Sequence, residues 1–497
     1  MALERSAPSP RSGSRLEQRT IDVIPEAERH GTPLNQFTLW FGANMQITAV
    51  VNGALAVVFG ADALWAVIGL LIGNLLGGVV MALHSAQGPR LGLPQMISSR
   101  AQFGVYGAVI PLLLVIVMYL GFAATGTVLA GQAVDEILHT SARPAGIVIF
   151  GALTALVAVV GYRYIHHLGR TATVLGAIGF AYLAVRLLTT EHLGSVFAAK
   201  PFGAATFLLA ISLGAGWQLT YGPYVADYSR YLPRTTSPRA TFHHTLWGSV
   251  IGSQWSMTFG ALLAASGTGF LDNQVGFLGH LGGGGTVAIL IYLVIIVGKL
   301  TVNCLNAYGG FMSILTSVSA FTLTRRISQA ARTAYISTFL ALSVLLALAA
   351  SSDFLDNFKN FVLALLMAFT PWSAINLADY YLVAKEHVDI PALYDPDGRY
   401  GRWNLIALGC YAAGVIAQIP FLAQTLYTGP IATMLGGADI SWIVGLVLTA
   451  GLYYPLTRTR SRAPHRTIYP EGFLDAPAQT AGVTPETPSE ASTERKR

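Results

Sequence analysis

Long apolar stretches, separated by short polar segments, repeat along the chain from residue 37 to residue 456. A helix needs roughly 20 residues to cross the hydrocarbon layer of a membrane, and most of the stretches are about that long. The pattern therefore predicts an all-α integral membrane protein with twelve spans. The predicted spans are residues 37–60, 64–84, 106–131, 145–162, 171–188, 205–227, 245–266, 286–319, 332–350, 358–383, 404–424 and 440–456.

The composition supports this interpretation. Apolar residues make up 53% of the 497 residues and charged residues only 11%, a balance typical of membrane proteins. The net charge is +6, and contacts with anionic lipid headgroups explain it more simply than nucleic-acid binding does. We therefore expect membrane lipid, and no nucleic acid, among the partners. The pattern carries no signal for the oligomeric state.

Basic and acidic residues fall in alternate loops between the predicted spans, and short cytoplasmic loops are enriched in Lys and Arg. The basic loops hold Arg90, Arg100, Arg163, Arg170, Arg230, Arg234, Arg239, Arg325, Arg326, Lys385, Arg399 and Arg402. The opposite loops hold Asp62, Asp135, Glu136, Glu191, Asp272, Asp353 and Asp439. Since the N-terminal segment is also rich in Arg, we expect both termini in the cytoplasm and the protein in the plasma membrane.

Two of the predicted spans contain residues that interrupt helices. The first span holds Gly42, Asn44 and Gln46, and the sixth reads Gly214-Ala-Gly-Trp-Gln-Leu-Thr-Tyr-Gly-Pro. In lipid, an interruption is tolerated only where it is buried in protein or lines a water-filled cavity. Secondary transporters often bind substrate between two inverted repeats whose corresponding helices are broken. We expect such a five-plus-five inverted repeat, although close packing of small residues is an alternative role for the glycines.

The inverted repeat predicts the division of the chain. A cytoplasmic tail of residues 1–36 precedes a transport core of residues 37–383, with repeat one at 37–188 and repeat two at 205–383. Two peripheral spans follow at 404–456. Residues 457–497 are rich in Pro, Thr, Glu and Arg without apolar periodicity, and we expect this cytoplasmic tail to be disordered.

The eighth span carries most of the polar residues at membrane depth. Lys299, Asn303 and Asn306 are spaced i, i+4, i+7 and share one helical face. A side-chain amide can donate and accept at once along the edge of a heterocycle, so Asn303 and Asn306 are candidate substrate ligands. A hydrogen bond between helices is the alternative role for either amide.

Aromatic residues could supply the faces of the same site, since a base gains roughly 1–3 kcal/mol by stacking on a ring. Trp217 lies within the interrupted sixth span, and Phe122 lies in the Gly121-Phe-Ala-Ala-Thr-Gly stretch of the third. Core packing or lipid contact is the usual role of such rings. The position of Trp217 at the interruption favours ligand contact.

Four sequence segments carry a resemblance to a known family. They are Gln36-Phe-Thr-Leu-Trp-Phe-Gly-Ala-Asn-Met-Gln, Gly88-Pro-Arg-Leu-Gly-Leu-Pro with Ser99-Arg-Ala-Gln-Phe-Gly-Val-Tyr-Gly, Ala226-Asp-Tyr-Ser-Arg-Tyr-Leu-Pro, and Ala378-Asp-Tyr-Tyr-Leu-Val. Over about residues 17–455 the chain resembles the nucleobase:cation symporter family, with its purine-cytosine permease branch and its allantoin, uracil and hydantoin transporters. The resemblance implies alternating access, with a base-like ring between spans one, three, six and eight.

The resemblance also implies roles for individual residues. Phe122 takes the place of the family's stacking tryptophan in span three, and Gly126 takes the place of its polar neighbour. In span six the resemblance favours Trp217 for stacking and Gln218 for hydrogen bonding. In span eight the resemblance matches the family's substrate amide to Asn303 or Asn306.

For the coupling cation, sodium-coupled relatives imply a site at Asn44, Ile47 and Thr301. The second hydroxyl expected beside Thr301 is absent, because its neighbours are Leu300 and Val302. Proton coupling is the alternative, with Asp227 and Asp379 as possible proton carriers. Apart from the co-transported Na+ or H+, we expect no cofactor.

Other function classes find less support. An enzyme would need a nucleophile, paired acids or a metal cluster at membrane depth, and the sequence pattern shows none of these. The two cysteines, Cys304 and Cys410, lie in apolar spans and do not predict a metal site. An amino-acid/cation symporter of the same fold is the main alternative, and a membrane enzyme or a receptor is less favoured. We expect a symporter that takes up a nucleobase, such as cytosine or a purine, or a related heterocycle.

Overall fold

The computed structural model describes residues 21–140, 143–160, 162–190, 201–267, 269–322, 328–471 and 473. Side chains at 143 and 159–173 are not described, and the loop residues Glu191, Arg325 and Arg326 and the ends of both predicted tails lie outside the described residues. Within these ranges the chain is helical, and its extended pairing is limited to two isolated bridges.

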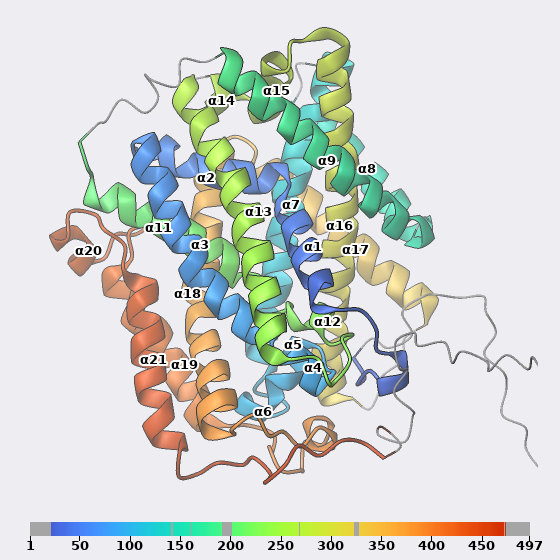
Figure 1. The fold of residues 1–497 in the computed structure, drawn as a ribbon, viewed down its shortest axis with the longest axis vertical. Helices are drawn as coiled ribbons and strands as arrows, with labels where there is room; N and C mark the ends of the chain where they lie inside the picture. The colour runs from blue at the N-terminus through green and yellow to red at the C-terminus, as the bar shows by residue number, and fades with distance from the viewer. Residues whose placement is uncertain are drawn as a thin grey trace, which may run out of the picture.

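The long helices form an elongated bundle (Figure 1). They are α1 (Pro33–Asn44), α2 (Ile47–Val58), α3 (Ala63–Ser85), α7 (Val109–Leu138), α8 (Arg143–Val160), α9 (Tyr162–Thr190), α11 (Ala204–Leu219), α13 (Pro238–Ser266), α16 (Gly285–Phe321), α17 (Gln329–Ala350), α18 (Phe354–Leu377), α19 (Leu405–Gln418) and α21 (Ser441–Thr457). The short helices are α4 (Gly88–Leu91), α5 (Gln95–Ser98), α6 (Arg100–Phe103), α12 (Ala226–Ser229), α14 (Gly269–Asp272), α15 (Gln274–Leu281) and α20 (Pro430–Met434). Single turns lie at η1 (Glu26–Glu28), η3 (Pro391–Tyr394) and η4 (Ile419–Phe421), and a π-helical stretch, η2 (Ala378–Val383), extends α18.

Each predicted span coincides with a helix. Five helical segments in the described ranges are long and apolar enough to cross a membrane, or six if the bent pair α1–α2 is one span. Further apolar helices are shorter, among them α11, α19 and α21. A multi-pass membrane protein is thus confirmed, while the count of twelve spans stays a prediction.

The first span is interrupted as the sequence predicts. Helix α1 ends at Asn44, α2 begins at Ile47, and the two axes are bent by 62°. The side-chain nitrogen of Asn44 donates to the carbonyl oxygen of Trp40 at 2.7 Å, and Gln46 has extended backbone angles at the start of α2. A polar side chain that bonds to nearby backbone competes with the helix, so these residues help to place the bend.

The sixth span is interrupted later than its glycines suggest. Gly214 and Gly216 are helical within α11, and the interruption is the turn at 220–225 that contains Gly222 and Pro223. A Cβ atom at Gly214 would lie 2.7 Å from the carbonyl oxygen of Leu70 in α3. Gly214 therefore serves close helix packing, which corrects the expectation that it forms part of the break.

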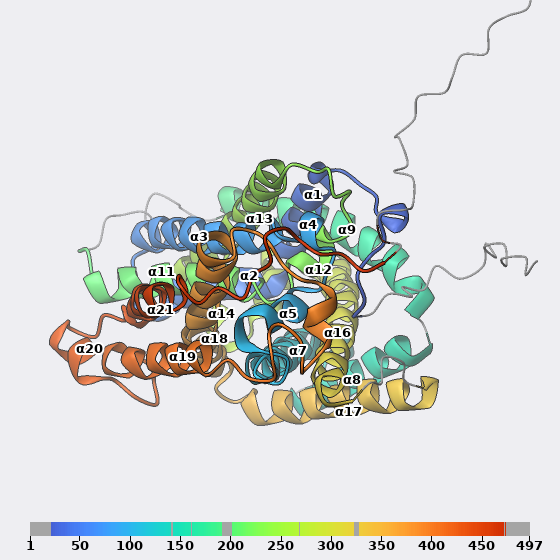
Figure 2. The ribbon, with the colours of Figure 1, turned by 90° about the horizontal axis from the view of Figure 1, so that it is seen from below.

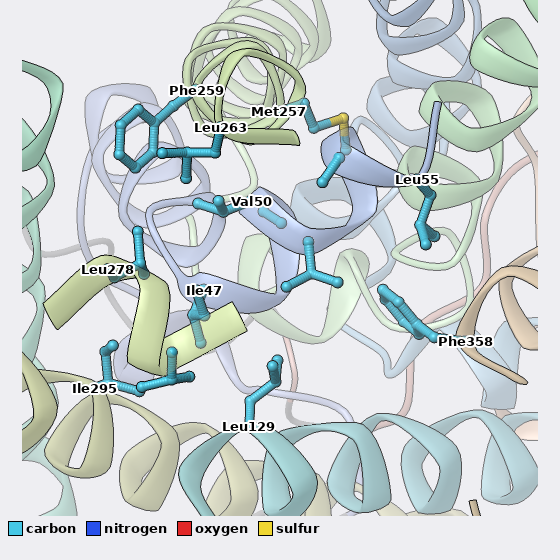
Figure 3. Packing of buried hydrophobic residues seen from close by; sticks show 14 of the residues in the cluster. Ile47, Val50, Leu55, Leu129, Met257, Phe259, Leu263, Leu278, Ile295 and Phe358 are labelled. Atoms are coloured by element: carbon cyan, nitrogen blue, oxygen red, sulfur yellow. The ribbon is translucent and has the colours of Figure 1, made fainter. Parts of the chain in front are cut away.

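Helix α2 lies at the centre of the larger hydrophobic core. All its residues from Ile47 to Ala56 are buried, as expected for a helix that is apolar all round. Figure 3 shows its side chains, including Val50 and Leu55, among residues of the surrounding helices. These residues include Leu129 of α7, Met257, Phe259 and Leu263 of α13, Leu278 of α15, Ile295 of α16 and Phe358 of α18.

Helices α19 and α21 pack against each other and against α18. Figures 1 and 2 show them along one edge of the bundle, away from α1 and α16. This arrangement is compatible with two peripheral spans outside a transport core.

Both described ends of the chain lie at one end of the bundle, here called the terminal end, with α4, α5 and α6 (Figure 2). Of the tail predicted to be disordered, the structure describes the first part, and this part is packed. Ile468 pairs with Asp389, and the hydroxyl of Tyr469 donates to the carbonyl oxygen of Arg90 at 2.9 Å. Burial lowers the pKa of nearby Arg29 to about 10, which leaves its guanidinium charged at neutral pH.

Candidate functional site

The side chain of Asn44 joins the two interrupted helices. Its oxygen accepts hydrogen bonds from Nε1 of Trp217 at 2.6 Å and from the hydroxyl of Tyr221 at 3.0 Å. Its nitrogen donates to the hydroxyl of Ser249 at 3.1 Å, besides the bond to Trp40. All four bonds that an amide can make are formed. The break in α1–α2 is thus attached to the last turns of α11 beside the other break.

Aromatic rings surround this junction. The rings of Phe122 and Trp217 meet edge to face, with centroids 5.7 Å apart and planes at 87°. Phe122 meets Phe361 of α18 in the same way at 5.2 Å, and Trp217 meets Tyr221 at 6.1 Å. We call Trp40, Phe122, Trp217, Tyr221 and Phe361 the aromatic cluster. Phe122 and Phe361 pack against both large hydrophobic cores, so the cluster lies where the cores meet.

Asn303 presents an unpaired acceptor close to this cluster. Its side-chain nitrogen donates to the carbonyl oxygen of Ala123 and to the hydroxyl of Thr127, both at 3.0 Å. Its side-chain oxygen is buried and has no partner among the described residues. A Cβ atom at Gly126 would lie 2.4 Å from that oxygen. Gly126 therefore provides the space for the amide, one helical turn from Phe122.

Asn306 is a second candidate on the same helix. Its side chain is partly buried, and its side-chain nitrogen is buried without a partner in the described part of the chain. Residues three apart on a helix are neighbours, so the free acceptor of Asn303 and the free donor of Asn306 lie on one face of α16. Unpaired buried polar atoms are costly, and a polar ligand would satisfy both.

Gln218 lies in a different environment from Trp217. Its side-chain nitrogen donates to the amide oxygen of Asn74 at 3.1 Å and to the hydroxyl of Ser253 at 2.8 Å. Its oxygen accepts from the hydroxyl of Ser249 at 2.6 Å. Successive residues on a helix point about 100° apart, which explains why Trp217 faces the aromatic cluster while Gln218 faces α3 and α13. The amide of Gln218 thus already has partners in the protein.

Lys299 contacts the bend in the first span. Its ammonium donates to the side-chain oxygen of Gln46 at 2.9 Å and to the hydroxyl of Thr48. The side chain is buried, and these acceptors are uncharged. The amide nitrogen of Gln46 in turn donates to the carbonyl oxygen of Ala43 in the last turn of α1, at 2.9 Å.

The residues expected to hold a cation are only partly brought together. Asn44 and Ile47 flank the bend, and the carbonyl oxygen of Asn44 accepts from the hydroxyl of Ser256 at 2.8 Å. Thr301 lies on α16, where its hydroxyl donates to the carbonyl oxygen of Val297 at 3.0 Å. Among the described residues, no hydrogen bond joins Thr301 to the bend. Within the same residues no cluster of three His, Cys, Asp or Glu side chains could hold a metal ion.

The two candidate proton carriers lie toward the terminal end. A carboxylate oxygen of Asp227 accepts from the backbone nitrogen of Gln95 at 2.8 Å, at the start of α5. Asp379 accepts from the side-chain nitrogen of Gln102 at 3.0 Å and from the hydroxyl of Tyr453 at 2.9 Å. Both acids thus connect elements of the terminal end, and none of these bonds involves the aromatic cluster.

A small cavity of about 20 Å³ lies between α7, α16, the second break and the segment that begins α5. Such a volume holds about one water molecule. Tyr119 precedes Phe122 by one turn of α7, and its ring lies 5.3 Å from that of Tyr224 at the second break. The lining comprises Pro94, Met96, Leu112, Val115, Tyr119, Pro223, Tyr224, Asp227, Met312, Ser313 and Thr316.

Some of these contacts were not expected from the sequence. The sequence predicts Asn44 only as a ligand of the coupling cation, and it predicts no site role for Tyr221 or Trp40. One signal was present: Trp40 and Asn44 are four residues apart, as are Trp217 and Tyr221, so each pair shares a helical face. The contact of Lys299 with the bend joins residues 253 positions apart, and no local pattern shows it.

Comparison with known proteins identifies the family. Residues 23–445 match the family described as "Permease for cytosine/purines, uracil, thiamine, allantoin". YxlA of Bacillus subtilis (strain 168), provisionally named a purine-cytosine permease, is 37% identical over 448 residues, which cover 90% of this chain and 97% of that protein. The purine-cytosine permease fcyB of Emericella nidulans is 28% identical over 471 residues, covering 88% of this chain and 87% of that protein.

Solved structures share the fold. The inward-facing conformation of Mhp1 gives a TM-score of 0.74 at 18% identity, covering 93% of this chain and 99% of that chain. A second structure is Mhp1 in a closed conformation, described as a nucleobase-cation-symport-1 family transporter with bromovinylhydantoin bound. It gives a TM-score of 0.68 at 20% identity, covering 90% of this chain and 96% of that chain. These likenesses confirm the predicted transporter fold. The match over most of the length shows that the chain belongs to the family of permeases for cytosine/purines, uracil, thiamine and allantoin, and that it is a membrane transporter and not an enzyme.

Proposed function

We propose that this protein takes up a purine, cytosine or a related heterocycle together with a cation, by alternating access. The main support is the free side-chain oxygen of Asn303, which is buried next to Gly126, and Gly126 follows Phe122 by one turn of α7. An acceptor beside an aromatic face suits a flat ring with N–H groups along its edge. The names of YxlA and fcyB support the same class of substrate.

In this proposal Trp217 and Phe122 supply ring contacts, and Asn303 and Asn306 bind the edge of the base. Gln218 acts indirectly, by holding α11 against α3 and α13. A ligand would enter by displacing the edge-to-face contact between Phe122 and Trp217. Since these two rings are in contact, a ligand can lie between them only if the rings move.

The membrane orientation follows the loop charges. We propose that the terminal end faces the cytoplasm of a plasma-membrane protein, because Arg90, Arg230 and Arg402 lie in the segments found there. The coupling cation is Na+ or H+. For sodium, Asn44, Ile47 and Thr301 are the proposed ligands, and for a proton, Asp227 and Asp379 are the proposed carriers.

One observation favours an amino-acid symporter as the second candidate. Such a carrier holds the substrate carboxylate at a free helix N-terminus, and the ammonium of Lys299 lies at the first turn of α2 beside Thr48. Against it, Lys299 already donates to Gln46 and Thr48, and an amino acid would leave the free amide atoms of α16 without a partner of matching shape.

The test is uptake of labelled cytosine and labelled hypoxanthine into cells that lack their own base carriers. Unlabelled purines, pyrimidines, allantoin, hydantoins and amino acids serve as competitors. Uptake of one label that purines or cytosine suppress supports the proposal. Uptake of amino acids alone, with no competition by any base, would show that the second candidate is correct.

A further inference from the structure

Lys299 has a buried positive charge that the proposed substrate site does not use. Only 3% of its surface is exposed, and among the described residues its partners are the neutral oxygens of Gln46 and Thr48. Lys359 is also buried but differs, because it pairs with the carboxylate of Asp356 at 3.1 Å. An ionised side chain within a membrane bundle is costly and usually marks a transport function.

The position of this charge is specific. Transporters with inverted repeats coordinate their coupling cation with unwound backbone and the C-terminal ends of half-helices. The bend between α1 and α2 is such a place, and Lys299 reaches it from α16. Gln46 connects the ammonium to the carbonyl oxygen of Ala43 in the last turn of α1, where a helix end favours positive charge.

The ligands also have the right chemistry for a cation. An ammonium offers three donors, and two are met by the amide oxygen of Gln46 at the bend and the hydroxyl of Thr48 in the first turn of α2. Neutral oxygens of this kind are ligands that hard cations accept. A sodium ion at the same oxygens would lie within contact distance of the ammonium, where repulsion between like charges is strong.

We propose that the ammonium of Lys299 is a resident cation at the α1–α2 bend, which replaces a co-transported sodium ion and makes transport independent of sodium. The transport assay for this inference rests on the proposed function. Of the two coupling cations considered, Na+ and H+, the inference excludes Na+. It also explains why the sequence lacks a second hydroxyl beside Thr301, since no sodium ion has to be coordinated there.

The test compares the wild-type protein with Lys299→Ala and Lys299→Gln in proteoliposomes. Uptake of labelled cytosine or hypoxanthine is measured with sodium outside and with choline in its place. We expect wild-type uptake to be equal in both solutions. In choline, both variants should take up the base about tenfold more slowly than the wild type, because the ammonium is missing. In sodium, Lys299→Ala should regain part of the rate, because a sodium ion can then bind the oxygens of Gln46 and Thr48. Lys359→Met is the matched control and should gain no response to sodium.

A second measurement does not depend on substrate. Thermal unfolding of the purified full-length proteins is followed in sodium chloride and in choline chloride. A bound ion stabilises the folded state by mass action, so sodium should raise the Tm of Lys299→Ala but not that of the wild type or of Lys359→Met. If no labelled base is taken up by the wild type, the proposed function fails, and this comparison still decides the role of Lys299.

Three results would overturn the inference. One is a wild-type protein whose uptake or Tm depends on sodium. Another is a pair of Lys299 variants that transport like the wild type in both solutions. The third is a loss of uptake in these variants that is confined to anionic substrates, which would make Lys299 a substrate ligand instead.

Discussion

Nε1 of Trp217 lies 2.6 Å from the side-chain oxygen of Asn44. This hydrogen bond joins a ring from the second interrupted helix to the end of the first half-helix. Because both groups are buried, the bond cannot be exchanged for water without opening the site. Movement that separates the two interrupted helices must therefore either preserve this bond or replace it with contacts to water or to a ligand.

Trp217→Phe should weaken uptake while the protein remains folded. The substitution keeps an aromatic ring but removes the N–H donor, which leaves the oxygen of Asn44 with one partner fewer. A lost buried hydrogen bond of about 1–2 kcal/mol corresponds to about tenfold weaker binding. The measurement is the KM for the labelled base, with membrane insertion checked by surface labelling. Trp247→Phe is the control, because Trp247 is 45% exposed on the bundle surface. An equal rise in KM in both variants would contradict the role of Trp217.

Gly126→Ala should reduce uptake by displacing the amide of Asn303. The added Cβ would lie 2.4 Å from the side-chain oxygen of Asn303, so the amide must move. We expect at least about tenfold lower affinity for the base, since a misplaced acceptor leaves the substrate N–H unpaired. Competition binding on purified protein measures this affinity.

Gly298→Ala is the matched control for that substitution. It lies on α16 close to Asn303 in sequence, and a Cβ there would meet nothing within 4 Å. Asn303→Ala supplies the second half of a double-mutant cycle, in which Gly126→Ala should add little to the loss already caused by Asn303→Ala. Fully additive effects would show that the two residues act separately.

Gln218→Ala should lower stability more than it lowers affinity. The change removes the acceptor of the Ser249 hydroxyl and one donor each from Asn74 and Ser253, and a buried group left unpaired costs about 1–3 kcal/mol. We expect a lower Tm and less folded protein, with a KM close to the wild-type value for the fraction that inserts. A normal Tm with a strongly raised KM would instead make Gln218 a direct substrate ligand.

With Asp379 as the proton carrier, Asp227→Asn should retain concentrative uptake. Its carboxylate accepts from the first backbone nitrogen of α5, and an asparagine oxygen can accept the same bond, since Asn and Asp cap helices comparably. The measurement is the steady-state accumulation ratio of the labelled base across a range of pH. Loss of accumulation with facilitated entry preserved would identify Asp227 as a proton carrier.

Much of the fold could be predicted from the sequence, because most of the predicted spans are long, apolar and bounded by polar loops. The bend after Asn44 was also expected, since Asn44 and Gln46 are poor residues for the centre of an apolar helix. The exact position of the second break was not. Gly214 and Gly216 lie within α11, and glycine is equally suited to unwinding and to close packing, so only the contact with α3 distinguishes the two roles.

The candidate site, like the fold, could be predicted from the sequence only in part. The rings of Trp217 and Phe122 are in contact, and Asn303 bonds to Ala123 and Thr127 of the same helix as Phe122, while their roles in binding stay a prediction. Gln218 could not be separated from Trp217 by sequence, because adjacent residues differ only in the direction that they face. The partners of Lys299 depend on how α16 packs against the bend, which is a property of the folded bundle.

The most direct test of the central claim is equilibrium binding of labelled bases to the purified protein and to its Asn303→Ala variant. Cytosine and hypoxanthine are the ligands, and amino acids are the competitors. We predict saturable binding of at least one base by the wild-type protein, no displacement by amino acids, and binding at least about tenfold weaker in the variant. Base binding of equal strength in both proteins, or displacement by amino acids alone, would contradict a base site formed by the two broken helices and α16.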